Sequence, residues 1–161
     1  MILIISITVW GVNLDVKESE LEEIENAIEE YKDSDEATLY PLIYDYYPKS
    51  EGGGYEKKNF GELSGGFLDD HGKVIDSFKD KFLYGMKIFE SKEKSLYQTI
   101  CCRHNVASDI GDVKELALLI LPLLPIATAT TLAVVFAIIL LKIGLPRFCD
   151  HCNSKYGTCT D

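Results

Sequence analysis

Basic residues, cysteines and internal repeats are all scarce in this chain of 161 residues. Lys and Arg number 16 against 26 Asp and Glu, so the formal net charge is −10. Phosphate binding needs clustered basic side chains, and we therefore expect no nucleic-acid partner. Five cysteines are too few for a disulfide-dense secreted scaffold. No repeat of useful length is present, which excludes a repeat array.

Motifs for catalysis and nucleotide binding are also missing. The chain has no G-x-x-x-x-G-K-[ST], and its glycine runs at 52–54 and 61–66 do not lie between an obvious strand and a helix start. Asp69-Asp70-His71-Gly72 is a polar cluster with acid/base potential, but these residue types also suit a surface turn. No nucleophile motif or second histidine cluster accompanies it, so we expect that the protein is not an enzyme.

A sharp division of charge is the main feature that the chain does have. Residues 1–115 hold 24 acidic and 13 basic residues, whereas residues 116–161 hold 2 and 3. Three parts are predicted: an acidic α+β domain over 1–110, an apolar helical segment over 111–146, and a cysteine-containing tail over 147–161.

The N-terminal part begins with an apolar run and continues with an amphipathic pattern. Residues 2–12 predict a central strand, because the run lacks the basic start and the cleavage site of a signal peptide. Residues 16–32 predict a helix, with Leu21, Ile24 and Ile28 on one face. The other face is rich in Glu, which indicates either a solvated surface or a docking surface for a basic partner.

Further strands are expected over 38–47 and as an antiparallel hairpin over 82–102, where apolar residues alternate on both sides of a charged turn at 90–94. Residues 73–81 suggest a short helix. The predicted fold class is α+β: a small mixed or antiparallel sheet with a packed amphipathic helix, followed by a highly apolar C-terminal helix or αα-hairpin.

The stretch 116–141 carries no charged residue and permits two interpretations. A helix over 122–141 would be roughly 30 Å long and would match a bilayer core. Alternatively, the two prolines of Leu121-Pro122-Leu123-Leu124-Pro125 mark the turn of an αα-hairpin with arms over 105–121 and 126–143. We favour the membrane span, because an uncharged helix of this length is hard to bury in a small domain.

The cysteines suggest a weak metal-binding pattern. Cys101 and His104 form a C-x-x-H pair, and Cys149 and Cys152 form a C-x-x-C pair. Pairs of this kind bind structural zinc, and hairpin arms of equal length would bring the two pairs to the same end. The alternatives are a disulfide within the tail or free buried cysteines. A single membrane span would place the pairs on opposite faces, so the span and the shared zinc site exclude each other.

Two functions follow as hypotheses. The first is a small membrane-anchored regulatory or effector protein whose cytoplasmic α+β domain senses a partner or ligand. The second is a cytoplasmic, soluble and oligomeric interaction module with a buried αα-hairpin that a structural zinc ion could clamp. The expected partners are accordingly the membrane and either another protein or a second copy of this chain, with no cofactor beyond that zinc.

Overall fold

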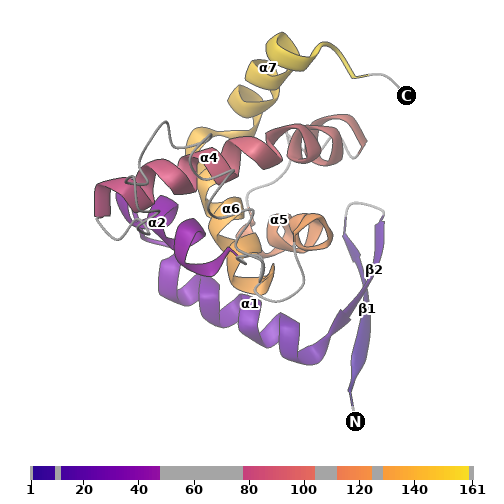
Figure 1. Cartoon of the computed structure of the whole chain (residues 1–161). Coiled ribbons are helices and arrows are strands. Elements are labelled where there is room, and N and C mark those ends of the chain that lie inside the picture. The colour runs from indigo at the N-terminus through magenta and orange to yellow at the C-terminus, as the bar shows by residue number, and fades with distance from the viewer. Residues whose placement is uncertain (1, 10–11, 48–77, 104–111, 125–128, 160–161) are drawn as a thin grey trace, which may run out of the picture.

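A computed structural model describes residues 2–9, 12–47, 78–103, 112–124 and 129–159 of the chain. These residues are mostly helical with one two-stranded antiparallel sheet, which confirms the predicted α+β class (Figure 1). In chain order the described elements are β1 (Ile4–Val9), β2 (Val12–Lys17), α1 (Glu18–Tyr31), α2 (Glu36–Tyr46), α4 (Phe78–Leu96), the π-helix η2 (Tyr97–Arg103), α5 (Val113–Ile120), the 3₁₀-helix η3 (Leu121–Leu123), α6 (Ala129–Ile143) and α7 (Leu145–Tyr156).

The two strands form a hairpin that leads directly into α1. Ile4 pairs with Lys17 at one end of the ladder, and Val9 pairs with Val12 at the other. One face is polar, with Ser6 Oγ donating to Asp15 Oδ1 at 2.8 Å, while Val16 on the opposite face is buried. The predicted strand over 2–12 corresponds to β1 at residues 4–9, while Val12 already belongs to β2. Its predicted central position is wrong, because the described sheet has two strands. The predicted helix over 16–32 is confirmed as α1.

The predicted strand over 38–47 is wrong, because these residues belong to α2. Asp35 caps the helix, its Oδ1 accepting a hydrogen bond from the Thr38 N–H at 3.0 Å. Leu39 and Ile43 are four residues apart and both fully buried, which is the spacing of one helical face. Pro41 is accommodated within this helix.

The predicted hairpin over 82–102 is also wrong. The chain there forms α4 and then η2, and the charged segment 90–94 continues the helix instead of turning. Tyr84 and Ile88 are buried four residues apart, so helical burial overrides the apparent alternation. Residues 78–81 of the predicted short helix form the first turn of α4, and residues 73–77 lie outside the described part.

The apolar segment forms the αα-hairpin and not one helix from Pro122. Pro122 lies in η3, α6 begins at Ala129, and α5 packs against α6. Gly144 has a φ of 95° and ends α6, after which α7 begins as a helix that the sequence did not predict. No single helix among the described residues is long and apolar enough to cross a membrane. Helices α6 and α7 taken together would be long and apolar enough, but the chain bends by 90° between them.

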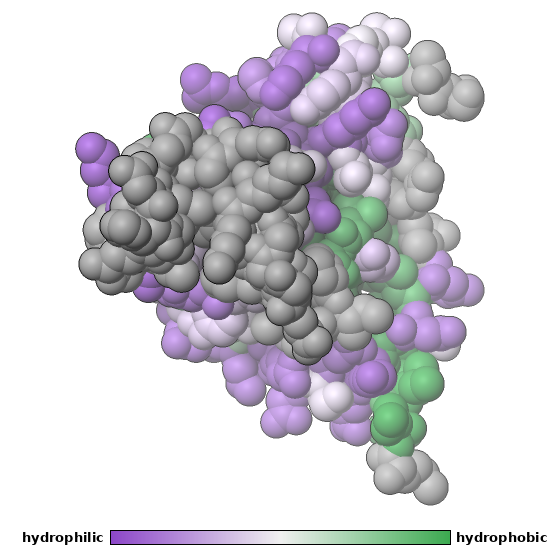
Figure 2. All heavy atoms as spheres, in the orientation of Figure 1, coloured by the Kyte–Doolittle hydropathy of each residue, from purple (hydrophilic) through white to green (hydrophobic). Residues whose placement is uncertain are grey.

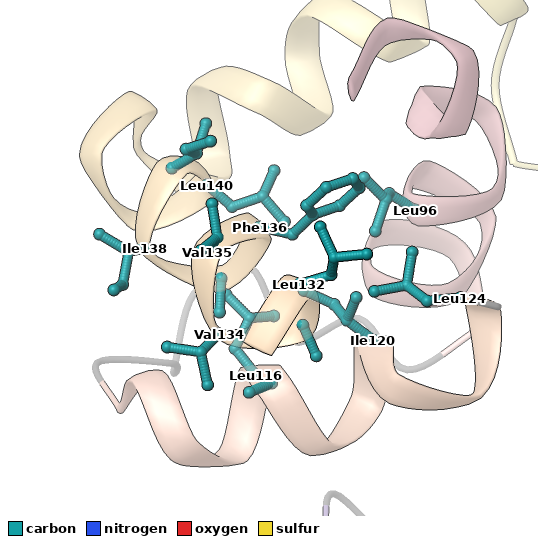
Figure 3. Packing of buried hydrophobic residues seen from close by; sticks show 14 of the residues in the cluster. Leu96, Leu116, Ile120, Leu124, Leu132, Val134, Val135, Phe136, Ile138 and Leu140 are labelled. Atoms are coloured by element: carbon teal, nitrogen blue, oxygen red, sulfur yellow. The ribbon is translucent and has the colours of Figure 1, made fainter. Parts of the chain in front are cut away.

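The core is centred on α6, as Figure 3 shows. Side chains from α5 and α4, among them Leu116, Ile120 and Leu96, surround it. Helices α1 and α2 cover other sides of α6, and Phe89 of α4 contacts Phe136 with ring centroids 5.2 Å apart. All three predicted parts of the chain contribute side chains to this one cluster.

The crossing of α2 and α4 depends on Gly85. A Cβ atom at this position would lie 1.8 Å from the carbonyl oxygen of Tyr40. That oxygen belongs to the backbone of α2, so no side-chain rotation relieves the overlap. The absence of a side chain at Gly85 therefore sets how closely the two helices approach.

Gly85→Ala is expected to destabilise the fold by about 2–4 kcal/mol, because α2 and α4 must separate to admit the methyl group. Urea unfolding followed by circular dichroism measures the change. Lys87→Ala, at a half-exposed position of the same helix, is the matched control and should stay within about 0.5 kcal/mol of the parent. Equal stability of the two variants would contradict the close approach.

Candidate functional site

The C-terminal helix α7 and the segment after it are tied to η2 by two disulfide bonds. Cys101 is bonded to Cys149 with their Cα atoms 5.8 Å apart, and Cys102 is bonded to Cys159 with a Cα separation of 5.2 Å. The two adjacent half-cystines on η2 thus hold both the first half of α7 and the segment after it. π-Helices are rare in proteins, and those that occur are often found at functional sites. The junction of η2 and α7 is therefore a candidate functional site.

The disulfides contribute to stability mainly by restricting the unfolded chain. The Cys101–Cys149 bond spans 48 residues, a loop whose closure is worth about 4 kcal/mol in the chain-entropy description. Once it is closed, the second bond adds a ring of only about a dozen residues and a contribution of about 3 kcal/mol. Together they keep α7 on the body of the protein without demanding a large apolar interface.

Two of the four residues predicted to hold zinc meet in this structure. Cys101 of η2 and Cys149 of α7 are brought together, as the shared site predicted, but as a disulfide. The arms of the αα-hairpin are not equal as predicted, since α5 has 8 residues and α6 has 15. A disulfide sulfur is not available as a thiolate ligand, so a zinc site on these residues stays a prediction for the reduced protein. Cys152 is buried with a free thiol, and His104 lies outside the described residues. No group of potential metal ligands gathers elsewhere in the described ranges.

Aromatic side chains add a non-covalent contact at the same junction. The rings of Tyr97 on η2 and Tyr156 on α7 stack with centroids 6.2 Å apart. The Tyr97 hydroxyl donates a hydrogen bond to the Gly157 carbonyl oxygen at 2.8 Å. Because Gly157 has a φ of 90°, it ends α7 and places that carbonyl where the hydroxyl reaches it.

Glu93 is the buried charged residue of the interface between α4 and α7. Its side chain is 8% exposed. Oε1 accepts hydrogen bonds from Lys155 Nζ at 3.1 Å and from the Tyr156 hydroxyl at 3.0 Å. Oε2 lies 3.8 Å from His151 Nε2. The hydrogen bond from Lys155 to Glu93 raises the pKa of the lysine, and burial followed by the Glu93 hydrogen bond raises the pKa of Tyr156.

The free thiol of Cys152 lies on the inner side of α7 and is fully buried. Burial, with a smaller contribution from the negative charge of Glu93, raises the pKa of this thiol to about 12. The thiolate is the reactive form of cysteine, so Cys152 is a packing residue in the folded protein at neutral pH.

A cavity of about 260 Å³ lies beside Glu93, where α7 crosses α4. Its apolar lining comes from four helices: Tyr40 of α2, Met86 and Phe89 of α4, Ile143 of α6, and Phe148 of α7. Pockets that bind small molecules are typically lined in this way, with a few polar groups that orient the ligand. The volume is slightly below the usual range for drug-sized ligands, roughly 300–1,000 Å³.

The polar lining of the cavity is divided between two helices, with the carboxylates on one and the guanidinium on the other. Glu90 and Glu93 lie on the α4 side, and Arg147 and His151 lie on the α7 side. Sequence reasoning missed this cluster because it places Glu90 and Glu93 in the charged turn of a hairpin. No local signal in the sequence marks Glu93 as buried, since its burial depends on the docking of α7.

The acidic face of α1 and the cluster at 69–72 were the other features noted in the sequence. Two glutamates of the acidic face of α1 make contacts within the chain, Glu23 accepting from Thr130 Oγ1 and Glu25 from Lys114 Nζ, each at 2.7 Å. Part of that face therefore binds α5 and α6. The cluster Asp69-Asp70-His71-Gly72 lies outside the described residues.

No protein-family model, curated protein or solved structure matches this chain. The site must therefore be interpreted from its own geometry.

The pairing of the cysteines predicts one free thiol that resists alkylation. Native protein treated with iodoacetamide at pH 8 should gain no adduct, because Cys152 is buried and its pKa is raised. In denaturant without reductant it should gain one adduct, and peptide mapping should place it on Cys152. Three or more adducts without reductant would contradict the two disulfides.

Stability should fall as the pH rises from about 9 towards about 12. The pKa of Cys152 is raised to about 12 in the folded protein, so the unfolded chain loses this proton at lower pH than the native chain does. The native state then binds more protons than the unfolded state, and the stability present below pH 9 is lost on the alkaline side. Burial raises the pKa of Tyr40 in the same direction, also to about 12.

Urea unfolding at pH 7 and pH 10 measures this dependence. Cys152→Ala removes one contributing group and should show a smaller loss between the two pH values than the parent. A parent protein that is equally stable at both would contradict the shifted pKa values.

Proposed function

We propose that this protein is a non-enzymatic sensing or interaction module whose fold is complete without a lipid bilayer. The observation that carries the proposal is the covering of α6 by the chain itself. Ten apolar side chains of this helix and Thr130 are buried within a single copy. A helix that is apolar on every side needs either lipid or protein around it, and here protein surrounds it.

The geometry of α6 supports this choice over the membrane-anchored alternative. Its 15 residues are about 22 Å long, against roughly 30 Å for a bilayer core. Thr130 at its start is hydrogen-bonded to Glu23 of α1, a contact between the apolar helix and an acidic surface helix. Insertion into a membrane would break that bond and would also expose the apolar faces of α1, α2 and α5 that pack on α6.

The two disulfides support an oxidising compartment, where such bonds form and persist, over the cytoplasm. The described surface in Figure 2 is largely hydrophilic, with an apolar area at the end of β1 where Ile2, Leu3 and Ile4 are exposed. Because one chain covers α6, self-association is not needed to bury it.

Fractionation of the full chain tests this proposal. We expect the protein in the supernatant after lysis and carbonate extraction without detergent, and we expect size-exclusion chromatography with light scattering to give the mass of a single, lipid-free species. Retention of the protein in the membrane pellet after carbonate treatment would favour the membrane-anchored alternative, in which α6 leaves this core.

A further inference from the structure

The cavity between α4 and α7 presents opposite charges on facing helices. Two carboxylates belong to α4, and a guanidinium and an imidazole belong to α7. Between them lies the apolar lining that includes Tyr40, Phe89 and Phe148. A site of this kind favours a ligand that carries both signs of charge next to an apolar body.

The two oxygens of the Glu93 carboxylate have different surroundings. Oε1 accepts hydrogen bonds from Lys155 and Tyr156. Oε2 has His151 Nε2 at 3.8 Å, beyond hydrogen-bond distance, and in the described part of the chain no closer donor reaches it. A buried carboxylate oxygen ordinarily has a donor, so Oε2 is an acceptor with capacity left for a ligand that enters the cavity.

Arg147 on the opposite wall is similarly available. Among the described residues, no carboxylate lies within ion-pair distance of its guanidinium, although Glu90 and Glu93 line the same cavity. The planar guanidinium is suited to bind a carboxylate through two parallel hydrogen bonds. Its position at the start of α7 adds the positive end of the helix dipole.

We propose that this cavity binds a small zwitterion with an apolar body, the chemistry of a free apolar amino acid. The ammonium group lies between Glu90 and Oε2 of Glu93, the carboxylate binds Arg147, and the apolar body packs against Tyr40 and Phe89. An amine without a carboxylate leaves Arg147 without a partner, and an acid without an ammonium group faces two carboxylates. The inference rests on the proposed function, because Ile143 of α6 lines the cavity and α6 must stay in this core, and it goes further by naming the chemistry of a ligand. Fractionation tests where α6 is buried, and the titrations below test the ligand.

Three probes of the same shape separate these chemistries. Isothermal titration of the purified full chain at pH 7.5 is carried out with L-phenylalanine, phenethylamine and 3-phenylpropanoate, which share the aromatic body and differ in their charged groups. We expect L-phenylalanine to bind about tenfold or more tightly than either of the others, since each of them lacks one charge-assisted hydrogen-bonding group. The absence of binding by L-phenylalanine up to millimolar concentration, or equally tight binding of the amine or the acid, would overturn the proposal.

Variants locate the binding within this cavity. Arg147→Gln and Glu90→Gln remove exposed charges, and each should weaken L-phenylalanine binding about tenfold. Lys142→Gln removes an exposed positive charge on α6 outside the cavity lining and should leave the affinity unchanged. Loss of affinity in Lys142→Gln equal to that in Arg147→Gln, or unchanged affinity in both cavity variants, would show that the zwitterion binds elsewhere.

Glu93→Gln tests the buried acceptor. Because Glu93 also binds Lys155 and Tyr156, the thermal midpoint of this variant is measured beside its affinity. A folded Glu93→Gln protein that binds L-phenylalanine as tightly as the parent would remove Oε2 from the site. If the variant does not fold, the results for Arg147→Gln and Glu90→Gln decide the question.

Discussion

The packing of the described chain depends on one helix, α6, which has almost no polar side chain on any face. Burying each large aliphatic or aromatic side chain contributes about 1.5–3 kcal/mol, so a helix with ten buried apolar residues cannot stay in water. Helices α1, α2 and α5 pack against α6, and Phe89 of α4 contacts Phe136 on it. The uncharged stretch 116–141 thus lies mostly inside one core, to which the acidic part of the chain also contributes side chains.

Among the helices around α6, α1 was predicted correctly because its helical period is clear in the sequence. The helix over 16–32 shows a clear apolar face next to an acidic one, and α1 confirms it. Helices α2 and α4 were assigned as strands because Tyr, Ile and Phe favour sheets and because short runs of apolar residues fit both periods. Packing against α6 selects the helical period over the strand period. Because α6 is far from α2 and α4 in the sequence, local patterns do not reveal this contact.

The candidate site could be predicted only in part, for the same reason. The predicted proximity of Cys101 and Cys149 is confirmed, although the arms of the αα-hairpin are unequal, and connectivity among five cysteines does not follow from spacing. The π-helix that presents adjacent cysteines to two different partners has no signature in the sequence. The burial of Glu93 could not be predicted, because this residue lies in a run of charged residues. Its side chain is buried only because α7 packs over it.

The attachment of α7 connects stability to the cavity. Helix α7 is largely polar and buries few side chains, among them Leu145, Phe148 and Cys152, so its own hydrophobic contribution is small. The disulfides and the Glu93 hydrogen bonds compensate by holding it at one position on α4 and η2. The cavity lies between α7 and α4, so the position of α7 also sets the arrangement of the charged groups on its two walls. The same bonds therefore stabilise α7 and preserve the arrangement of opposite charges that lines the cavity.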